Sequence, residues 1–186
     1  MFTEPDSDTE VSQNGIVLVE KIMARYPEVL FQLQPPQLLE FFFMFTLKVL
    51  NGKEPLPKIA AADFWVSPPI QLLLLLMSSR LDTTLTRRRK PQSGFISLKT
   101  DDTTLQATVV NAMAHLGPLL TQTLVQNIGG NAARSELEKV SDPLKKLVTN
   151  QPRAQAWLEQ ALFDPSFPST QVTREDKVMF LKKIIG

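Results

Sequence analysis

The residues of this sequence that could do chemistry are few. The chain has one histidine, His115, and no cysteine, so a disulfide framework, a thiolate zinc site and a His-rich metal site are excluded. A histidine-dependent triad would have to be built around His115, which precedes Gly117 and Pro118 close to an expected helix end. A histidine that caps a helix or is partly buried is the simpler interpretation there. We therefore expect no catalytic residue, no metal and no cofactor, with an enzyme centred on His115 as the alternative.

Other residues that could bind or react also have simpler structural interpretations. Asp101 and Asp102 precede an expected helix, where acidic side chains complement the helix dipole. The glycine pair at 129–130 is not followed by Lys-Ser or Lys-Thr, so it is not a phosphate-binding loop. Trp65 and Trp157 lie on apolar helix faces and are expected in the core. None of these patterns supports an enzyme.

The positive charge of the chain is concentrated in its middle. In total 20 Lys+Arg oppose 19 Asp+Glu, a net charge of +1. Residues 1–65 carry −4, residues 66–100 carry +5, and residues 101–186 are neutral. The basic run RRRK at 87–90 could be a nuclear localisation or nucleic-acid patch, but a solvated loop is the simpler interpretation. A near-neutral chain is not built mainly to neutralise phosphates, so we expect no direct nucleic-acid partner.

The sequence carries no targeting or membrane signal that we can identify. Residues 1–10 are acidic and polar, which is unlike a signal peptide, and we expect them to be disordered. The longest apolar run, at 70–77, is far shorter than the roughly 20 residues that span a bilayer. We therefore expect a soluble chain with no membrane partner.

The spacing of apolar residues predicts helices along most of the chain. They are expected over residues 11–26, 37–50, 58–65, 103–115, 119–128, 135–148, 153–163 and 174–185. Gly15 weakens the first of these helices, and Thr173 is the expected N-cap of the last. Strand patterns are nearly absent, so the fold class is all-α. Short Pro/Gly breaks between such helices favour a HEAT- or armadillo-like α-solenoid of stacked antiparallel helix hairpins, about 40 residues per unit. An ordinary bundle is the alternative.

Three local patterns make sharper predictions. The helix over 37–50 is apolar nearly all round, so it should be sandwiched between other helices. Ser135 followed by Glu138 matches a capping box at a helix start. Pro143 and the pair at 117–118 each predict a kink or a break.

Four stretches, in order, resemble a known family. They are LNGKEPLPK at 50–58 before an alanine-rich helix ending in Phe64-Trp65, GGNAARS at 129–135, Trp157-Leu158, and PSFPS at 165–169. Together they resemble the C-terminal part of importin-β-type karyopherins, on the branch of importin thirteen and transportin three. Their order and spacing carry the resemblance, since no single motif is diagnostic.

The resemblance implies HEAT-like repeats over residues 11–65 and 93–186, forming one solenoid piece. It also implies a receptor that carries protein cargo through nuclear pores and shuttles between cytoplasm and nucleus, with loading and release governed by the small GTPase Ran. Family members are several times longer, and their principal Ran-binding repeats lie toward an N-terminal part that this chain lacks. The chain is therefore expected to be a C-terminal fragment, with Ran and nucleoporins bound by the missing part of its parent.

The resemblance breaks over residues 66–92, an atypical basic, Leu-rich insertion. Codons permitted at 66–67, 85–86 and 92 can spell a GTAAGT donor, a CTGAC branch point and a CAG acceptor, so the segment could be an in-frame translated intron. Removing it would join two parts of one helix and align four apolar residues on one face: Ala61, Trp65, Phe95 and Leu98. The alternative is a genuine insertion with a short helix and a basic loop.

Removal of residues 66–92 would leave a mildly acidic solenoid suited to basic protein cargo. Two alternatives to a karyopherin fragment stay open. One is a generic helical-repeat scaffold unrelated to nuclear transport, and the other is a truncated gene product with little function of its own.

Overall fold

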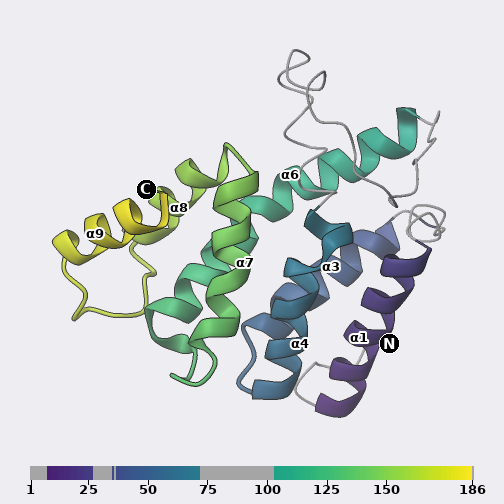
Figure 1. Ribbon diagram of the computed structural model, residues 1–186, viewed down its shortest axis with the longest axis horizontal. Helices are drawn as coiled ribbons and strands as arrows, with labels where there is room; N and C mark the ends of the chain where they lie inside the picture. The colour runs from purple at the N-terminus through teal and green to yellow at the C-terminus, as the bar shows by residue number, and fades with distance from the viewer. Residues whose placement is uncertain (1–7, 27–34, 36, 72–102, 186) are drawn as a thin grey trace.

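Helices make up every regular element in the part of the chain that the structure, a computed structural model, describes: residues 8–26, 35, 37–71 and 103–185 (Figure 1). The elements are α1 (Thr9–Arg25), α3 (Gln37–Leu50), α4 (Pro55–Val66), α6 (Thr103–Gln126), the wide turn η2 (Asn127–Asn131), α7 (Leu137–Asn150), α8 (Ala154–Phe163) and α9 (Arg174–Ile185). The predicted all-α class is thereby confirmed.

The helices pack in a regular order. The short connection at 51–54 turns the chain back, so α3 and α4 pack against each other. In space α3 lies beside α6 and α6 beside α8, while α4 lies beside α7 and α7 beside α9. At the N-terminal end, α1 packs mainly against α4 (Figure 1). This placement leaves α1 and α3 as neighbours over α4.

The first helix begins earlier than the sequence predicted. The Asp8 side chain accepts a hydrogen bond from the Val11 N–H at 3.0 Å, which caps α1 and lets it start at Thr9. The last two residues of the segment expected to be disordered are therefore helical, and residues 1–7 lie outside the described part. Gly15 does not delay the helix. Similarly, α4 begins at Pro55 because proline is well tolerated in a first helical turn.

The start of α7 differs from the prediction. No capping box forms between Ser135 and Glu138, because the helix begins at Leu137. The carboxylate that serves this turn belongs to Glu136, whose Oε2 accepts from the Ala133 N–H at 2.8 Å. The predicted capping box is therefore wrong, and Glu136 at the N-cap position makes no side-chain cap to α7.

Neither internal proline breaks its helix, so of the predicted kink or break the break is wrong. Pro118 lies within a continuous α6, and Pro143 lies buried within a continuous α7. A proline inside a helix costs about 3 kcal/mol, so tertiary packing of the apolar faces must outweigh that cost here. The Thr121 hydroxyl also donates to the Gly117 carbonyl at 2.9 Å.

The C-terminal boundaries follow the prediction closely. Gly130 adopts φ 144°, and the Ala132 N–H donates to the Asn127 carbonyl at 2.9 Å, so the glycine pair ends the helix as expected. At α9, the Asp176 N–H donates to the Thr173 hydroxyl at 3.2 Å and the Thr173 N–H donates to the Asp176 carboxylate at 3.0 Å. Thr173 is therefore the N-cap, in a reciprocal capping box.

The core places both tryptophans as predicted. Trp65 is buried, with its ring 5.6 Å from those of Phe43 and Phe64. Trp157 is partly buried and packs so closely on Gly117 that a Cβ there would lie 2.5 Å from its ring.

Only the first six residues of the 66–92 segment are described. The helix α4 ends at Val66, as the following prolines at 68–69 predict. Ile70 is fully buried, and Gln71 donates to the Trp65 carbonyl at 2.7 Å while accepting from Asn150 at 2.8 Å. Residues 72–92 with their basic run, the expected helix across the join to residue 93, and Asp101 and Asp102 all lie outside the described residues.

None of the helices in the described ranges is both long enough and apolar enough to cross a membrane.

Candidate functional site

The one histidine does not lie where the sequence suggested. His115 is exposed in the middle of α6, so the expectation of a helix-capping or partly buried residue is wrong. The reason is that Pro118 does not end the helix. Within the described part of the chain, no group of three or more His, Asp or Glu residues could hold a metal ion.

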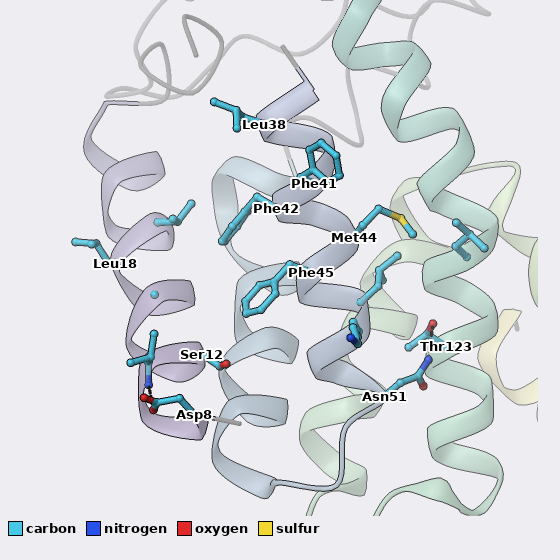
Figure 2. A pocket seen from close by; sticks show the side chains of 16 residues that line it. Asp8, Ser12, Leu18, Leu38, Phe41, Phe42, Met44, Phe45, Asn51 and Thr123 are labelled. Atoms are coloured by element: carbon cyan, nitrogen blue, oxygen red, sulfur yellow. Dashed lines mark hydrogen bonds between the residues drawn. The ribbon is translucent and has the colours of Figure 1, made fainter. Parts of the chain in front are cut away.

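The described surface contains an apolar groove along α1 and α3, closed at one side by α6. It has a volume of about 1000 Å³. Figure 2 shows its side chains projecting from these three helices. The groove is lined by Asp8, Val11, Ser12, Gly15, Leu18, Val19, Leu38, Phe41, Phe42, Met44, Phe45, Leu47, Lys48, Asn51, Leu119 and Thr123.

The groove exists because α3 has more apolar surface than its neighbours cover. Phe43 and Leu47 on one side of α3 are buried in the core. On another side Phe41 is 65% exposed and Met44 is 44% exposed. The prediction that this helix lies between other helices is confirmed, because α4 and α6 both pack on it. One side of α3 nevertheless stays open among the described elements.

The opposite wall comes from one face of α1. Val11 and Leu18 project from that face and stay largely exposed, with Gly15 between them. Residues at these spacings share a helix face. A Cβ on Gly15 would have no heavy atom within 4 Å, so the backbone of α1 is open to the groove at its centre.

The inner part of the groove is held by aromatic contacts. The ring of Phe42 lies edge-on to that of Phe64 of α4, with 5.4 Å between centroids and 82° between planes. Phe45 lies 6.5 Å from Phe42. Edge-to-face pairs of this kind add about 0.5–1.5 kcal/mol to the area they bury. The inner part is therefore anchored in the core.

A polar cluster fixes the end of the groove near the C-terminus of α3. The Asn51 amide donates to the Thr123 hydroxyl at 3.4 Å, and the Asn127 amide donates to the Asn51 side-chain oxygen at 3.2 Å. Asn127 also donates to the Thr123 carbonyl at 2.9 Å. These bonds tie the α3–α4 connection to α6.

The lining chemistry favours binding over catalysis. Of the lining residues only Asp8 and Lys48 are ionisable, and both lie toward the end where α1 starts and α3 finishes. No histidine or acidic pair lines the hollow to act as general acid or base. The groove can therefore hold an apolar surface by excluding water from it.

A second unpredicted feature is a buried ion pair. Lys58 Nζ lies 3.2 Å from Glu136 Oε2, and the two side chains are 2% and 3% exposed. The pair ties α4 to the turn before α7 and includes the carboxylate that caps that turn. One signal was visible in the sequence, because Lys58 lies within an otherwise apolar helix start.

An exposed charge cluster joins α1, α4 and α7 on their outer side. Lys139 donates to Asp63 at 3.1 Å, and that hydrogen bond raises the pKa of Lys139. The pKa of Glu20 is also raised, first by partial burial and then by the neighbouring Asp63 carboxylate. The cluster therefore contains one repulsive carboxylate pair, Glu20 and Asp63, and Lys21 offsets only part of its effect on the pKa of Glu20.

The comparisons with known proteins leave the family unassigned. No family model, no curated protein and no solved structure matches the chain significantly. The likeness to karyopherins therefore rests on the order of the four stretches in the sequence.

Proposed function

We propose that the chain is an α-solenoid segment that binds another protein through the groove between α1 and α3. The single observation that carries the binding role is the groove itself, a hollow of about 1000 Å³ whose lining is mostly apolar. Large exposed apolar patches with polar edges often mark sites where a protein binds a partner.

The order of helix packing supports the solenoid. The helices can be grouped into three hairpins, α3–α4, α6–α7 and α8–α9. The first helices of these hairpins pack in succession, and so do the second helices. Stacked hairpins in which each unit contacts its neighbours produce this order. An experimental structure of the full chain tests the solenoid directly, because a closed bundle would bring α3 into contact with α9.

The binding role is tested with partners found by proximity labelling in cells and then purified. A partner that forms a stoichiometric complex with the full chain in sedimentation supports the proposal. A monodisperse monomer in the absence of partner would count against an aggregating, truncated gene product. If no purified candidate forms a complex, the binding role is wrong.

On the sequence resemblance we further propose that the segment belongs to an importin-β-type karyopherin acting between cytoplasm and nucleus. The structure gives the resembling stretches a packing role, because a Cβ on Gly129 would lie 2.7 Å from the ring of Phe167. Tight contacts of this kind are typical of the packed core of a repeat and not of a surface that binds cargo. Binding of purified Ran-GTP and nucleoporin fragments by the full-length parent tests this proposal, and binding of neither favours the generic scaffold.

The predicted preference for basic cargo has little support in the described residues. They carry 14 basic and 13 acidic side chains, so their charge favours neither kind of partner. An apolar partner surface fits the groove better than a basic one.

A further inference from the structure

We propose that the groove takes the apolar face of an amphipathic helix of about three turns from another protein. This inference rests on the proposed protein-binding function and names the kind of partner surface involved. Helices that lay an apolar face into such a groove are a recurring mode of recognition.

The dimensions of the walls set the length of the occupant. Lining residues run from Asp8 to Val19 on α1 and from Leu38 to Asn51 on α3 (Figure 2). At 1.5 Å per residue these walls are about 17 and 20 Å long. A three-turn helix is about 16 Å long, so it fits the groove from end to end.

The distribution of charge sets the character of the occupant. Asp8 and Lys48 lie toward one end of the groove, and the rest of the hollow is lined mainly by aliphatic and aromatic side chains. A charged side chain buried in the middle would lose its hydration without a counter-ion. The buried face of the partner must therefore be uncharged, with polar residues confined to its outer face and to its end near Asp8.

Gly15 gives independent support for a helix. Glycine inside a helix costs about 0.5–1 kcal/mol relative to alanine, and no described part of this chain uses the space left by its missing Cβ. That space allows another helix to approach the backbone of α1 closely. Met44 on the opposite wall adds an adaptable contact, since its unbranched side chain can fill irregular gaps.

A second copy of this chain fits less well. A two-fold dimer would place the groove against itself, and two facing hollows leave a void. The groove has 16 lining residues, fewer than the roughly 20–30 per side in a standard stable interface. A single convex helix fills the hollow with this smaller contact.

The test selects helical peptides on the folded full chain. A phage-displayed library of 16-residue helices, varied at apolar positions i, i+4, i+7 and i+11, is enriched on the wild type. The best peptide is labelled, and its affinity is measured by fluorescence anisotropy. Phe41→Asp and Met44→Asp at the groove should weaken binding at least tenfold, and Gly15→Leu should do the same by filling the hollow.

Matched controls separate the groove from general stickiness. Leu56→Asp and Met179→Asp change apolar side chains that are each 62% exposed and do not line the groove. These controls should leave the affinity within twofold of wild type. Thermal unfolding of every variant checks that loss of binding is not loss of fold.

Several outcomes would overturn the inference. One is that no peptide is enriched over a scrambled library, and another is that the control variants lose as much affinity as the groove variants. A third is that the groove binds the fatty acid laurate saturably in place of the peptide. A fourth is that the chain forms a dimer that Phe41→Asp abolishes. A purified protein partner whose affinity is unchanged by Phe41→Asp would overturn this inference and leave the proposed function standing. Groove-dependent peptide binding with no protein partner would overturn the proposed function alone.

Discussion

The side of α4 toward α7 and the side toward α1 and α3 use their side chains in opposite ways. Toward α7, the interface encloses a lysine and a glutamate that are almost wholly removed from water. Toward α1 and α3, the molecule leaves a phenylalanine and a methionine in solvent. Charge is buried between α4 and the turn before α7, and apolar surface is exposed in the groove between α1 and α3. In the proposed function, the α1–α3 side binds a partner while the α4–α7 side is closed to water.

The largest expected effect comes from breaking the buried pair. Lys58→Ala should destabilise the protein by about 3–5 kcal/mol, because it leaves the Glu136 carboxylate buried without a counter-ion. Urea unfolding measures the change. Lys48→Ala at the open end of the groove is the matched control and should cost under about 0.5 kcal/mol, as expected for an exposed side chain. Equal losses would mean that the two regions do not differ.

Adding a methyl group to the packed region should cost less. In Gly117→Ala the new Cβ would meet the Trp157 ring at 2.5 Å, so the ring or the helix must shift. Overpacking of this kind costs about 1–3 kcal/mol. Thermal unfolding together with tryptophan fluorescence should show both a lower midpoint and a changed Trp157 environment. An unchanged midpoint would show that the ring moves freely.

A glycine-to-alanine substitution in the groove should raise the free energy of unfolding instead of lowering it. Gly15→Ala places its methyl group in open space and removes a flexible residue from the middle of α1. We expect a gain of about 0.5–1 kcal/mol in the free energy of unfolding. Chemical denaturation measures it alongside Gly117→Ala. A loss at both glycines would contradict the proposed openness of the groove.

The smallest expected effect lies in the exposed charge cluster. The pKa of Glu20 is raised in the folded state, so its contribution to stability is present below its unfolded pKa and is lost as pH rises through the folded value. Glu20→Gln should therefore gain a few tenths of a kcal/mol at pH 7, a size typical of surface charge pairs, and nothing at pH 3. Unfolding free energies across that range measure the difference. A gain that does not change with pH would assign the effect to packing.

Local sequence signals predicted the helices better than they predicted the helix interruptions. The glycine pair at 129–130 and the threonine cap at 173 act within one turn, so the sequence contains what determines them. The breaks predicted at Pro118 and Pro143 do not occur, because tertiary packing outweighs the cost of a proline inside each helix. The predicted capping box before α7 does not form, and the Glu136 carboxylate there contacts Lys58, which is 78 residues away.

The groove could be predicted only in part. The all-round apolar character of α3 was visible in the sequence, but which side stays uncovered depends on α1 packing against α4. The exposed position of His115 was not predicted, because the sequence suggested a helix end near Pro118 and α6 continues past it. The translated-intron hypothesis for residues 66–92 stays a prediction. Ile70 and Gln71 of that segment are packed into the core, and sequencing of the transcript decides the question.

The two tryptophans lie in different helix hairpins. Trp65 lies among aromatic rings on α4, and Trp157 lies against a glycine of α6 from its place on α8. In a stack of units that contact only their neighbours, cooperativity is carried by the interfaces between units. The fluorescence of each ring therefore reports on a separate helix hairpin. The two fluorescence signals together show whether the hairpins unfold cooperatively or one after another.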